Sequence, residues 1–370
     1  MANGKKEETM IELDGDELQF SFPEVHHFAD MSISFQQTLR IPDDGTDYPL
    51  PPGFRDFPLV HVDDYSENVP YSWIEHGGVM LPMYQSEGLW TCFSGRSHQK
   101  TMPECKGKKY KDSILQFPEY PFAIKVATGK INALTGDLWN ERLQKDPQDY
   151  MVSTEQPWLD GYCVEKGIIR QFVAMPLGAG YTAEEQLTGG AQYGGLQIIA
   201  YPMKKESYER LFPPREKPVP YSDECNFPID NRKICSVKEN MGLAPGGRMK
   251  QGIFQDPFSI DDWDMDHKSR CFVHIVNSLM WKAITGKNPP NLPLLAVHYE
   301  YYGLPWFEYY DENAQPIDGS KKLETLKSVV EMGKEKDPAP LPENESVEPK
   351  NIVELFNELA NNQVREGTGW

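Results

Sequence analysis

The chain has 370 residues, of which 39% are hydrophobic and 12% aromatic, and this composition excludes a disordered protein. Asp and Glu number 56 against 37 Lys and Arg, so the formal net charge is −19. A surface of this charge repels phosphate backbones and anionic lipid headgroups, so we expect no nucleic acid and no membrane among its partners, which leaves a small anionic ligand or a protein partner.

The N-terminal segment, residues 1–18, is polar and charged, and we expect it to be flexible. It contains no apolar stretch of the kind found in signal peptides, and no run in the chain reaches the roughly 20 apolar residues of a membrane span. The six cysteines include no Cys-x-x-Cys pair. Reduced thiols in the cytoplasm are the simplest interpretation, so we expect a soluble cytoplasmic protein.

Residues 19–212 carry the pattern of an antiparallel β-rich domain. Apolar and polar side chains begin to alternate at residues 31–39, which is typical of a strand. Two hairpins are predicted, at residues 122–134 and 162–175, because each contains a two-residue turn with a glycine. Short strands joined by tight turns favour a sandwich or barrel-like sheet, since parallel strands need crossover connections of about a dozen or more residues.

His61 and Asp63 are the candidate catalytic residues of this domain, because an imidazole and a carboxylate can exchange protons with a substrate. No G-x-S-x-G sequence and no recognisable Cys/His pairing accompanies them, so the sequence indicates no nucleophile. The alternative is that these residues are ordinary polar groups at the ends of secondary-structure elements.

A glycine-rich stretch at residues 178–183 follows a predicted strand and superficially matches a dinucleotide-binding turn. Thr182 and Glu185, however, form a capping box, which satisfies the free N–H groups at the start of the next helix. That helix can extend only to about Thr188, which is too short for the crossover helix of a dinucleotide-binding fold. We therefore expect a capped surface turn and no cofactor.

Residues 213–256 are rich in Pro and Gly, and they are predicted to connect the β-rich domain to the rest of the chain. Within them Gly246, Gly247, Arg248 and Lys250 combine a flexible backbone with two cations, which suits the binding of a carboxylate or a phosphate. The alternative is an irregular surface loop, which is common where Gly and Pro are frequent.

Residues 257–333 are predicted to form a helical part that packs on the β-rich domain. Apolar residues recur at helical spacing through residues 270–285, and a second helix is predicted at residues 320–332. Residues 334–370 are predicted to be a polar, proline-rich tether with a short amphipathic helix at residues 352–359.

His267, Cys271 and His274 stand at positions i, i+4 and i+7, so on a helix they would form one stripe. Such a stripe could supply three zinc ligands. The spacing matches no zinc-finger pattern and no fourth ligand is evident nearby, so we keep these residues as candidates but expect no metal.

Seven aromatic residues crowd into residues 299–310. Among them, Trp306 and Tyr309 are the candidates for the wall of a ligand pocket, because large amphipathic rings suit a binding surface. The alternative is that these rings pack the helical part against the β-rich domain.

Four stretches of the chain together resemble a family of hypothetical proteins, mainly from microbial genomes. They are Gln-Pro-Trp-Leu-Asp-Gly at residues 156–161, the glycine-rich stretch at residues 175–189, Met-Gly-Leu-Ala-Pro-Gly-Gly at residues 241–247 and Leu-Pro-Trp-Phe-Glu-Tyr-Tyr at residues 304–310. The resemblance covers most of the chain from about residue 30 onward, and it implies no catalytic residues.

Together these patterns predict an α+β fold with a mainly antiparallel β N-terminal part and a helical C-terminal part. The lack of a reaction signature favours an intracellular binding or interaction protein of unknown ligand. One alternative is an enzyme, for example a hydrolase, with its site at the seam between the two parts. The other is a structural subunit of a larger assembly, and the sequence leaves open whether the protein is an enzyme.

Overall fold

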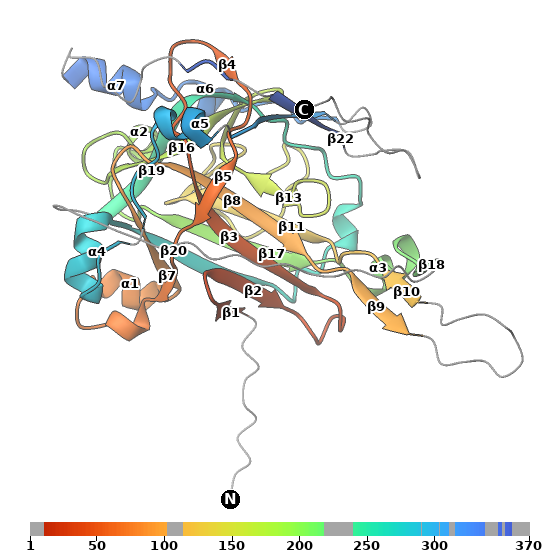
Figure 1. Cartoon of the computed structure of the whole chain (residues 1–370). Helices are drawn as coiled ribbons and strands as arrows, with labels where there is room; N and C mark the ends of the chain where they lie inside the picture. The colour runs from red at the N-terminus through yellow and green to blue at the C-terminus, as the bar shows by residue number, and fades with distance from the viewer. Residues whose placement is uncertain are drawn as a thin grey trace, which may run out of the picture.

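The structure is a computed structural model, and it describes residues 11–101, 114–217, 240–289, 291–302, 304–310, 315–336, 347–349 and 352–356. Most strands of these residues join one large sheet in which antiparallel pairs predominate, and short helices lie around it (Figure 1). The predicted mainly antiparallel β-structure is therefore confirmed. None of the described helices is both long enough and apolar enough to cross a membrane.

The strands fall into two groups by their hydrogen-bonding partners. The first group comprises β1 (Ile11–Asp14), β2 (Glu17–Ser21), β3 (Asp30–Thr38), β5 (Gly53–Asp56), β8 (Gly88–Gly95) and β14 (Trp158–Leu159). In this group β3 lies between β2 and β8 and pairs antiparallel with both.

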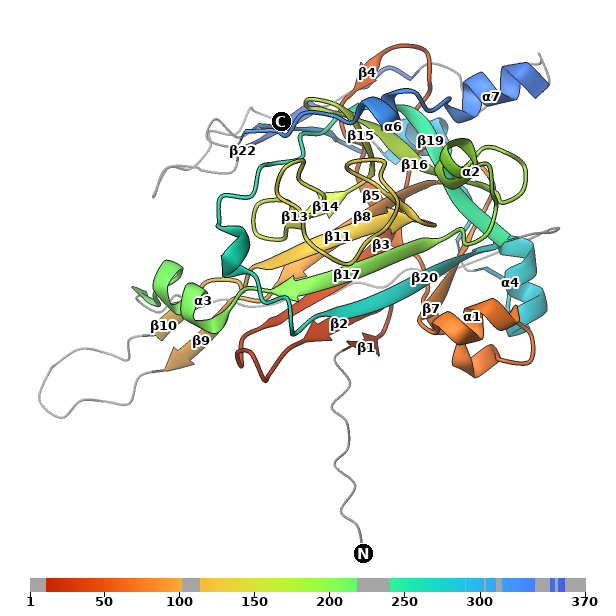
Figure 2. The same ribbon diagram turned by 180° about the vertical axis from the view of Figure 1, so that it is seen from behind.

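The second group comprises β6 (Val60–His61), β7 (Val79–Met83), β11 (Phe122–Thr128), β12 (Ile131–Asn132), β13 (Met151–Val152), β17 (Leu196–Pro202) and β20 (Ser269–Asn277). In this group β17 pairs antiparallel with β11 and with β20. β20 also pairs in parallel with β7, so strands from distant parts of the chain lie side by side (Figure 2).

Two long strands, β16 (Ile168–Pro176) and β19 (Asn240–Lys250), connect the two groups. β16 pairs with β8 and with β19, and β19 pairs in turn with β20. β15 (Gly161–Glu165) pairs with β16, and β4 (Asp47–Tyr48) pairs with β19. The prediction that Gly246, Gly247, Arg248 and Lys250 lie in a connecting region is therefore wrong, because these residues belong to the sheet.

Glycine in β19 allows close approach of neighbouring backbone and side chains. A Cβ atom on Gly247 would lie 2.3 Å from the carbonyl oxygen of Pro42, and one on Gly246 would lie 2.5 Å from Val173 Cγ2. Glycine is the residue that such crowding requires in a strand. The glycines that suggest a flexible loop therefore lie in a strand, where they leave room for neighbouring atoms.

The hydrophobic core joins residues of the two strand groups. Phe22, which follows β2, contacts Phe122 of β11 with ring centroids 5.7 Å apart, and neither ring is exposed. Ile33 of β3 and Ile198 of β17 belong to the same cluster. Burying each Phe ring contributes roughly 1.5–3 kcal/mol.

Both predicted hairpins are confirmed. Thr128 of β11 lies opposite Ile131 of β12, and Gly129 between them has a φ of 54°. Gly167, in the turn between β15 and β16, has a φ of 78°. Positive φ is the conformation that a two-residue hairpin turn needs and that glycine adopts without strain.

The helical C-terminal part is only partly present. The described helices are α1 (Tyr71–His76), α2 (Ala183–Thr188), α3 (Lys205–Leu211), α4 (Ser278–Thr285), α5 (Ala296–Tyr302), α6 (Lys321–Glu324) and α7 (Val329–Lys336), with two short 3₁₀ turns at Asp63–Tyr65 and Ile260–Asp262. The predicted helix at residues 270–285 is wrong in its first half, which is strand β20. The side chain of Asn277 ends this strand and caps α4 by accepting a hydrogen bond from the N–H of Leu279 at 3.0 Å.

The predicted helix at residues 352–359 is also wrong over the residues that the structure describes. β22 (Ile352–Phe356) is a strand, and it pairs in parallel with β21 (Trp306–Tyr310). Residues 357–359 lie outside the described residues. A further small sheet joins β9 (His98–Thr101), β10 (Ile114–Phe117) and β18 (Arg215–Lys217).

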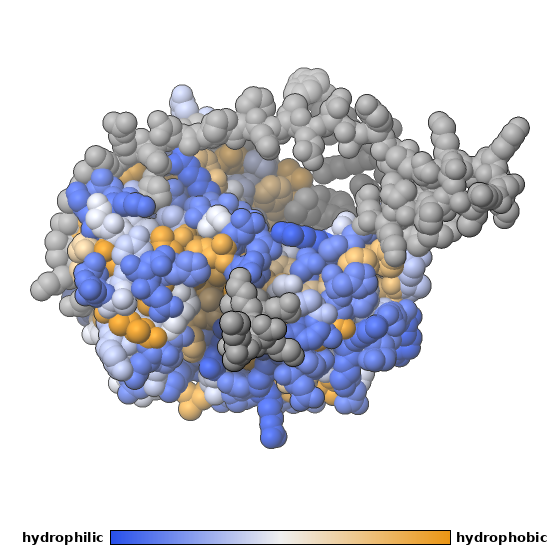
Figure 3. Space-filling view, turned by 90° about the horizontal axis from the view of Figure 1, so that it is seen from below, coloured by the Kyte–Doolittle hydropathy of each residue, from blue (hydrophilic) through white to orange (hydrophobic). Residues whose placement is uncertain are grey.

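The face of the molecule that lies lowest in Figure 1 is mostly hydrophilic, with small separate hydrophobic patches (Figure 3). Scattered apolar side chains of this kind are normal on a protein surface. The described residues of this face therefore form no large apolar patch of the kind that marks an interaction surface.

Candidate functional site

The two cations of the predicted anion-binding loop are already paired with carboxylates. Arg248 donates from Nε to Asp47 Oδ1 at 2.6 Å and from Nη1 and Nη2 to the two oxygens of Glu165 at 2.7 and 3.1 Å. These bonds raise the pKa of Arg248. Lys250 Nζ donates to Glu308 Oε1 at 2.7 Å. An anion at this place would have to displace a carboxylate of the protein from each cation.

The aromatic candidates lie on β21 close to these pairs. Trp306 is buried, and its ring lies 6.4 Å from that of Tyr48 in β4. Tyr309 pairs through its backbone with Leu355 of β22, and its side chain lies outside the description. Trp306 therefore packs in the core, as in the alternative to a ligand-pocket wall.

His61 and Asp63 both lie exposed on the surface, at the end of β6 and in the following 3₁₀ turn. No hydrogen bond joins the two side chains within the described part of the chain. Although His61 and Asp63 are close in sequence, the structure does not bring their side chains together as an acid–base pair.

The stripe of His267, Cys271 and His274 is wrong, because the residues from 269 onward form strand β20. Cys271 and His274 are three positions apart on a strand, so their side chains point to opposite faces of the sheet. His267 contacts Asp264, with Nδ1 2.9 Å from Oδ2. Among the described residues no group of three or more His, Cys, Asp or Glu side chains could hold a metal ion.

His274 instead lines a cavity of about 280 Å³ beside β20. Four segments that are distant in sequence meet there, namely helix α1, the turn between β11 and β12 with the loop after it, residues 192–197, which end at the start of β17, and β20. We call it the aromatic cavity because six of its lining residues carry aromatic rings, namely Trp73, His76, Trp139, Tyr193, Phe272 and His274.

The rings of the aromatic cavity support one another. Trp73 stacks on His274 with centroids 4.4 Å apart and an interplanar angle of 22°. His76 meets Phe272 edge to face at 4.8 Å and Tyr193 at 6.1 Å. Such contacts are worth about 0.5–1.5 kcal/mol per pair beyond burial, so these walls are held in place without a ligand.

Helix α1 owes its position to a second, smaller hydrophobic cluster. Trp73 of α1, Met80 of β7 and Trp281 of α4 pack together there, and α1 and α4 lie side by side in both views (Figures 1 and 2). Asn68 Nδ2, just before α1, donates to the carbonyl oxygen of Ile284 in α4 at 3.1 Å. The cluster thereby fixes the helix that carries Trp73 and His76 to the cavity.

Two cations face this cavity in a protein that is strongly acidic overall. Arg270 Nη1 donates to Glu141 Oε1 at 2.9 Å, so its charge is shared with a carboxylate. Lys130 Nζ lies 4.0 Å from the centre of the Tyr193 ring and makes no ion pair with a described carboxylate. Lys130 acts on the Glu184 carboxylate through its charge but forms no ion pair with it, so it is the less engaged of the two cations.

Glu184 of α2 holds two walls of the cavity together. Its Oε2 accepts hydrogen bonds from the N–H groups of Gly194 at 3.0 Å and Tyr193 at 3.3 Å. A Cβ on Gly129 would lie 2.4 Å from the same oxygen, so the β11–β12 turn approaches the carboxylate closely. Burial raises the pKa of Glu184, although the N–H groups of Gly194 and Tyr193 and the charge of Lys130 act in the opposite direction.

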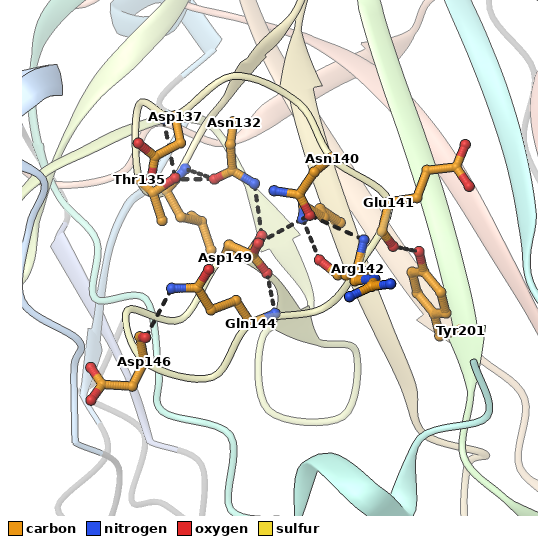
Figure 4. A network of polar contacts seen from close by, with 12 residues as sticks. Asn132, Thr135, Asp137, Asn140, Glu141, Arg142, Gln144, Asp146, Asp149 and Tyr201 are labelled. Atoms are coloured by element: carbon orange, nitrogen blue, oxygen red, sulfur yellow. Dashed lines mark hydrogen bonds and ion pairs between the residues drawn. The ribbon is translucent and has the colours of Figure 1, made fainter.

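The loop that carries Trp139 is fixed by a buried lysine of β11. Lys125 Nζ donates to Asp149 Oδ2 at 2.6 Å, to the carbonyl oxygen of Arg142 at 2.7 Å and to Asn140 Oδ1 at 3.1 Å. Figure 4 shows how Asp149, Asn140 and Arg142 converge from the loop. Burial raises the pKa of Asp149 more than the bond from Lys125 lowers it.

A larger cavity, of about 590 Å³, lies on the other side of the same loop. Its lining mixes Asp and Lys side chains, which largely pair with one another. Its buried Asp256 accepts bonds from the Tyr150 hydroxyl, from Trp263 Nε1 at 2.9 Å and from the N–H of Phe258 at 2.7 Å. Because that carboxylate is fully engaged, we take the aromatic cavity as the candidate site.

No protein-family model, curated protein or solved structure was found to match the chain. The candidate site therefore rests on the geometry of this chain. Sequence reasoning singled out His274, but as a metal ligand on a helix, and it treated Lys130 only as a turn residue. Trp73, Trp139 and Tyr193 carried no local signal, since nothing in their neighbouring residues indicates that they meet.

Proposed function

We propose that this protein binds a small planar organic anion in the aromatic cavity. The supporting observation is that Lys130 lines the aromatic cavity over the Tyr193 ring and forms no ion pair with a described carboxylate, in a chain of net charge −19. Aromatic walls favour a flat ligand, and a cation favours a carboxylate over a neutral group.

The size of the cavity limits the ligand. Pockets for drug-sized molecules span about 300–1,000 Å³, and this cavity has about 280 Å³. A ligand of one or two fused rings with a carboxylate therefore fits better than a nucleotide or an oligosaccharide. Indole-3-carboxylate has this size, shape and charge and serves as a probe.

An enzyme remains the second candidate, because Ser72 and His76 both line the cavity. The His76 ring bonds through Nδ1 to the backbone carbonyl oxygen of Ser72 and not to its hydroxyl. A serine nucleophile needs a base on its hydroxyl group. The observed bond therefore favours binding over hydrolysis.

In the structural-subunit alternative, the helix predicted at residues 352–359 would serve as a docking arm. Residues 352–356 pair as a strand with β21 of the same chain, which removes the helical arm over these residues. No other observation favours that alternative.

Isothermal titration calorimetry of the full chain with indole-3-carboxylate and with its neutral amide, indole-3-carboxamide, tests the proposal. We expect saturable binding of the carboxylate and binding of the amide that is about tenfold or more weaker, because a hydrogen bond to a charged group contributes about 1.5–3 kcal/mol. Absence of carboxylate binding would contradict the proposal.

A matched pair of lysine variants tests whether Lys130 is the cation that binds the ligand carboxylate. Lys130→Met is expected to weaken carboxylate binding about tenfold and to leave amide binding nearly unchanged. Lys166→Met is the control, because Lys166 is also exposed in a two-residue hairpin turn but does not line the cavity. Equal weakening in both variants would indicate a general electrostatic effect and not a site at Lys130.

A further inference from the structure

His274 has a defined hydrogen-bonding state. Its Nε2 lies 3.0 Å from the carbonyl oxygen of Gly77. A carbonyl oxygen can only accept, so Nε2 carries the proton and donates. Burial lowers the pKa of His274 to about 4, so the ring is neutral at neutral pH. In a neutral ring with the proton on Nε2, Nδ1 is a hydrogen-bond acceptor.

The Nδ1 acceptor of His274 has no hydrogen-bond partner among the described residues, although the residue is only 7% exposed. The ring is held in place by stacking on Trp73 and lines the aromatic cavity. Nδ1 is not among the buried side-chain atoms that lack a partner, so it keeps accessible surface. A ligand that fills the cavity displaces the water that reaches this nitrogen, so the acceptor then needs a donor from the ligand.

His76, the other imidazole of the cavity, does not require a hydrogen-bond donor from the ligand. His76 is exposed, and its Nδ1 bonds to the carbonyl oxygen of Ser72 within α1. Water can satisfy the remaining nitrogen of an exposed ring at little cost. His274 is therefore the imidazole whose free acceptor discriminates between ligands.

We infer that the ligand is a heteroaromatic acid whose ring N–H donates a hydrogen bond to His274 Nδ1 while its carboxylate meets Lys130. This inference rests on the proposed function and narrows its ligand class to planar anions that carry a ring N–H, such as indole-type carboxylates. A ligand without that donor displaces water from this acceptor and leaves it unpaired, and sites that bond a donor reject such analogues strongly.

Two isosteric probes test the inference on the unmodified full chain. Indole-3-carboxylate has a ring N–H, and 1-benzothiophene-3-carboxylate has a sulfur atom at the same position with nearly the same shape and the same charge. By calorimetry we expect the benzothiophene acid to bind at least about tenfold more weakly. Equal affinity for the two acids would overturn the inference but leave the proposed function standing, whereas failure of both acids to bind would overturn both.

A variant pair assigns the discrimination to one ring. His274→Phe keeps a ring to stack on Trp73 but removes the acceptor, so we expect the preference for the N–H ligand to fall to about twofold or less. His61→Phe is the matched control, because His61 is exposed and does not line the cavity, and this variant should keep the full preference. A preference that survives in His274→Phe would overturn the assignment.

Nuclear magnetic resonance of the unmodified protein covers the case in which His274→Phe does not fold. With ¹⁵N-labelled histidine, the unprotonated nitrogen of His274 should shift when indole-3-carboxylate binds and should shift much less with the benzothiophene acid. An identical response to both acids would contradict a hydrogen bond at Nδ1.

Discussion

The carboxylate of Glu184 accepts a hydrogen bond from the backbone N–H of Gly194 at 3.0 Å, and this contact joins helix α2 to a wall of the aromatic cavity. The same oxygen accepts from Tyr193 at 3.3 Å, and Gly129 lies against it. One buried side chain thus positions residues from two of the four segments that form the site. The cavity depends on Glu184 even though Glu184 is not among its lining residues.

Replacing Glu184 with Met should loosen this wall. Met has a similar length but cannot accept the two hydrogen bonds, so the amide hydrogens of Tyr193 and Gly194 should exchange with solvent about tenfold faster or more. Glu184→Gln keeps one acceptor oxygen and should stay close to the unmodified protein. Hydrogen–deuterium exchange over residues 189–195 provides the measurement.

The neighbouring Glu185 supplies the control for that experiment. Its carboxylate accepts bonds from Thr182 and Gly180 at the start of α2, not from the loop that lines the cavity. Glu185→Met should therefore speed exchange at residues 180–182 and leave residues 193–194 unchanged. If both variants loosened residues 193–194 equally, the effect would belong to α2 as a whole and not to Glu184.

Lys125→Met should destabilise the protein strongly. Lys125 is 1% exposed, and its removal leaves the buried carboxylate of Asp149 without its cation. Breaking a buried ion pair in this way costs about 3–5 kcal/mol of unfolding free energy, which urea denaturation measures. Adding Asp149→Asn should recover part of the loss, because the unpaired charge is then gone. A purely additive double variant would contradict a direct coupling between the two residues.

The stability of the protein should fall as the pH drops from about 6.5 towards 4, and His274 should cause part of the fall. Its pKa is about 4 in the folded protein against 6.5 ordinarily, so between these values the unfolded chain binds a proton that the folded protein does not. At pH 5 this amounts to about 2 kcal/mol. The loss of unfolding free energy between pH 7 and pH 5 should therefore be about 2 kcal/mol smaller in His274→Phe, and an unchanged loss would contradict a buried neutral ring.

Glu87 should make the free energy of unfolding decrease as the pH rises, which is opposite to the effect of His274. Burial raises its pKa to about 7, against the bonds that its carboxylate accepts from the N–H of Tyr84 and from Gln37. A raised acid pKa stabilises the folded state at low pH, and this contribution is lost as the pH rises from about 4.5 through 7. In Glu87→Gln this contribution should be absent. The change in unfolding free energy between pH 5 and pH 8, measured for the variant and for the unmodified protein, should therefore differ by about 2–3 kcal/mol.

The parts of the fold that the sequence predicts well are those set by neighbouring residues. The hairpin turns at Gly129 and Gly167 and the capping box of Thr182 and Glu185 follow from a few adjacent residue types, and all are present. The sequence of strand β20 predicts a helix because the strand is buried on most of both faces, so its apolar residues show no alternation. Its Val and Ile residues were the remaining signal for a strand.

The candidate site could not be predicted in this way. Trp73, Lys130, Tyr193 and His274 come from four segments, and long-range contacts bring them together, among them the pairing of β20 with β7 and β17. At Arg248 the sequence predicts a site that the structure does not have, because cations close to glycines indicate a free anion-binding loop. The carboxylates that neutralise Arg248, Asp47 and Glu165, are far away in the sequence.

Hydrogen–deuterium exchange of the full chain with and without saturating indole-3-carboxylate tests most directly whether a planar anion occupies the aromatic cavity. We expect slower exchange in the segments that line it, at residues 71–76, 129–139, 192–197 and 270–274, and no change around Arg248 and Lys250. Protection centred on residues 242–250, or no protection anywhere, would contradict a binding site in the aromatic cavity.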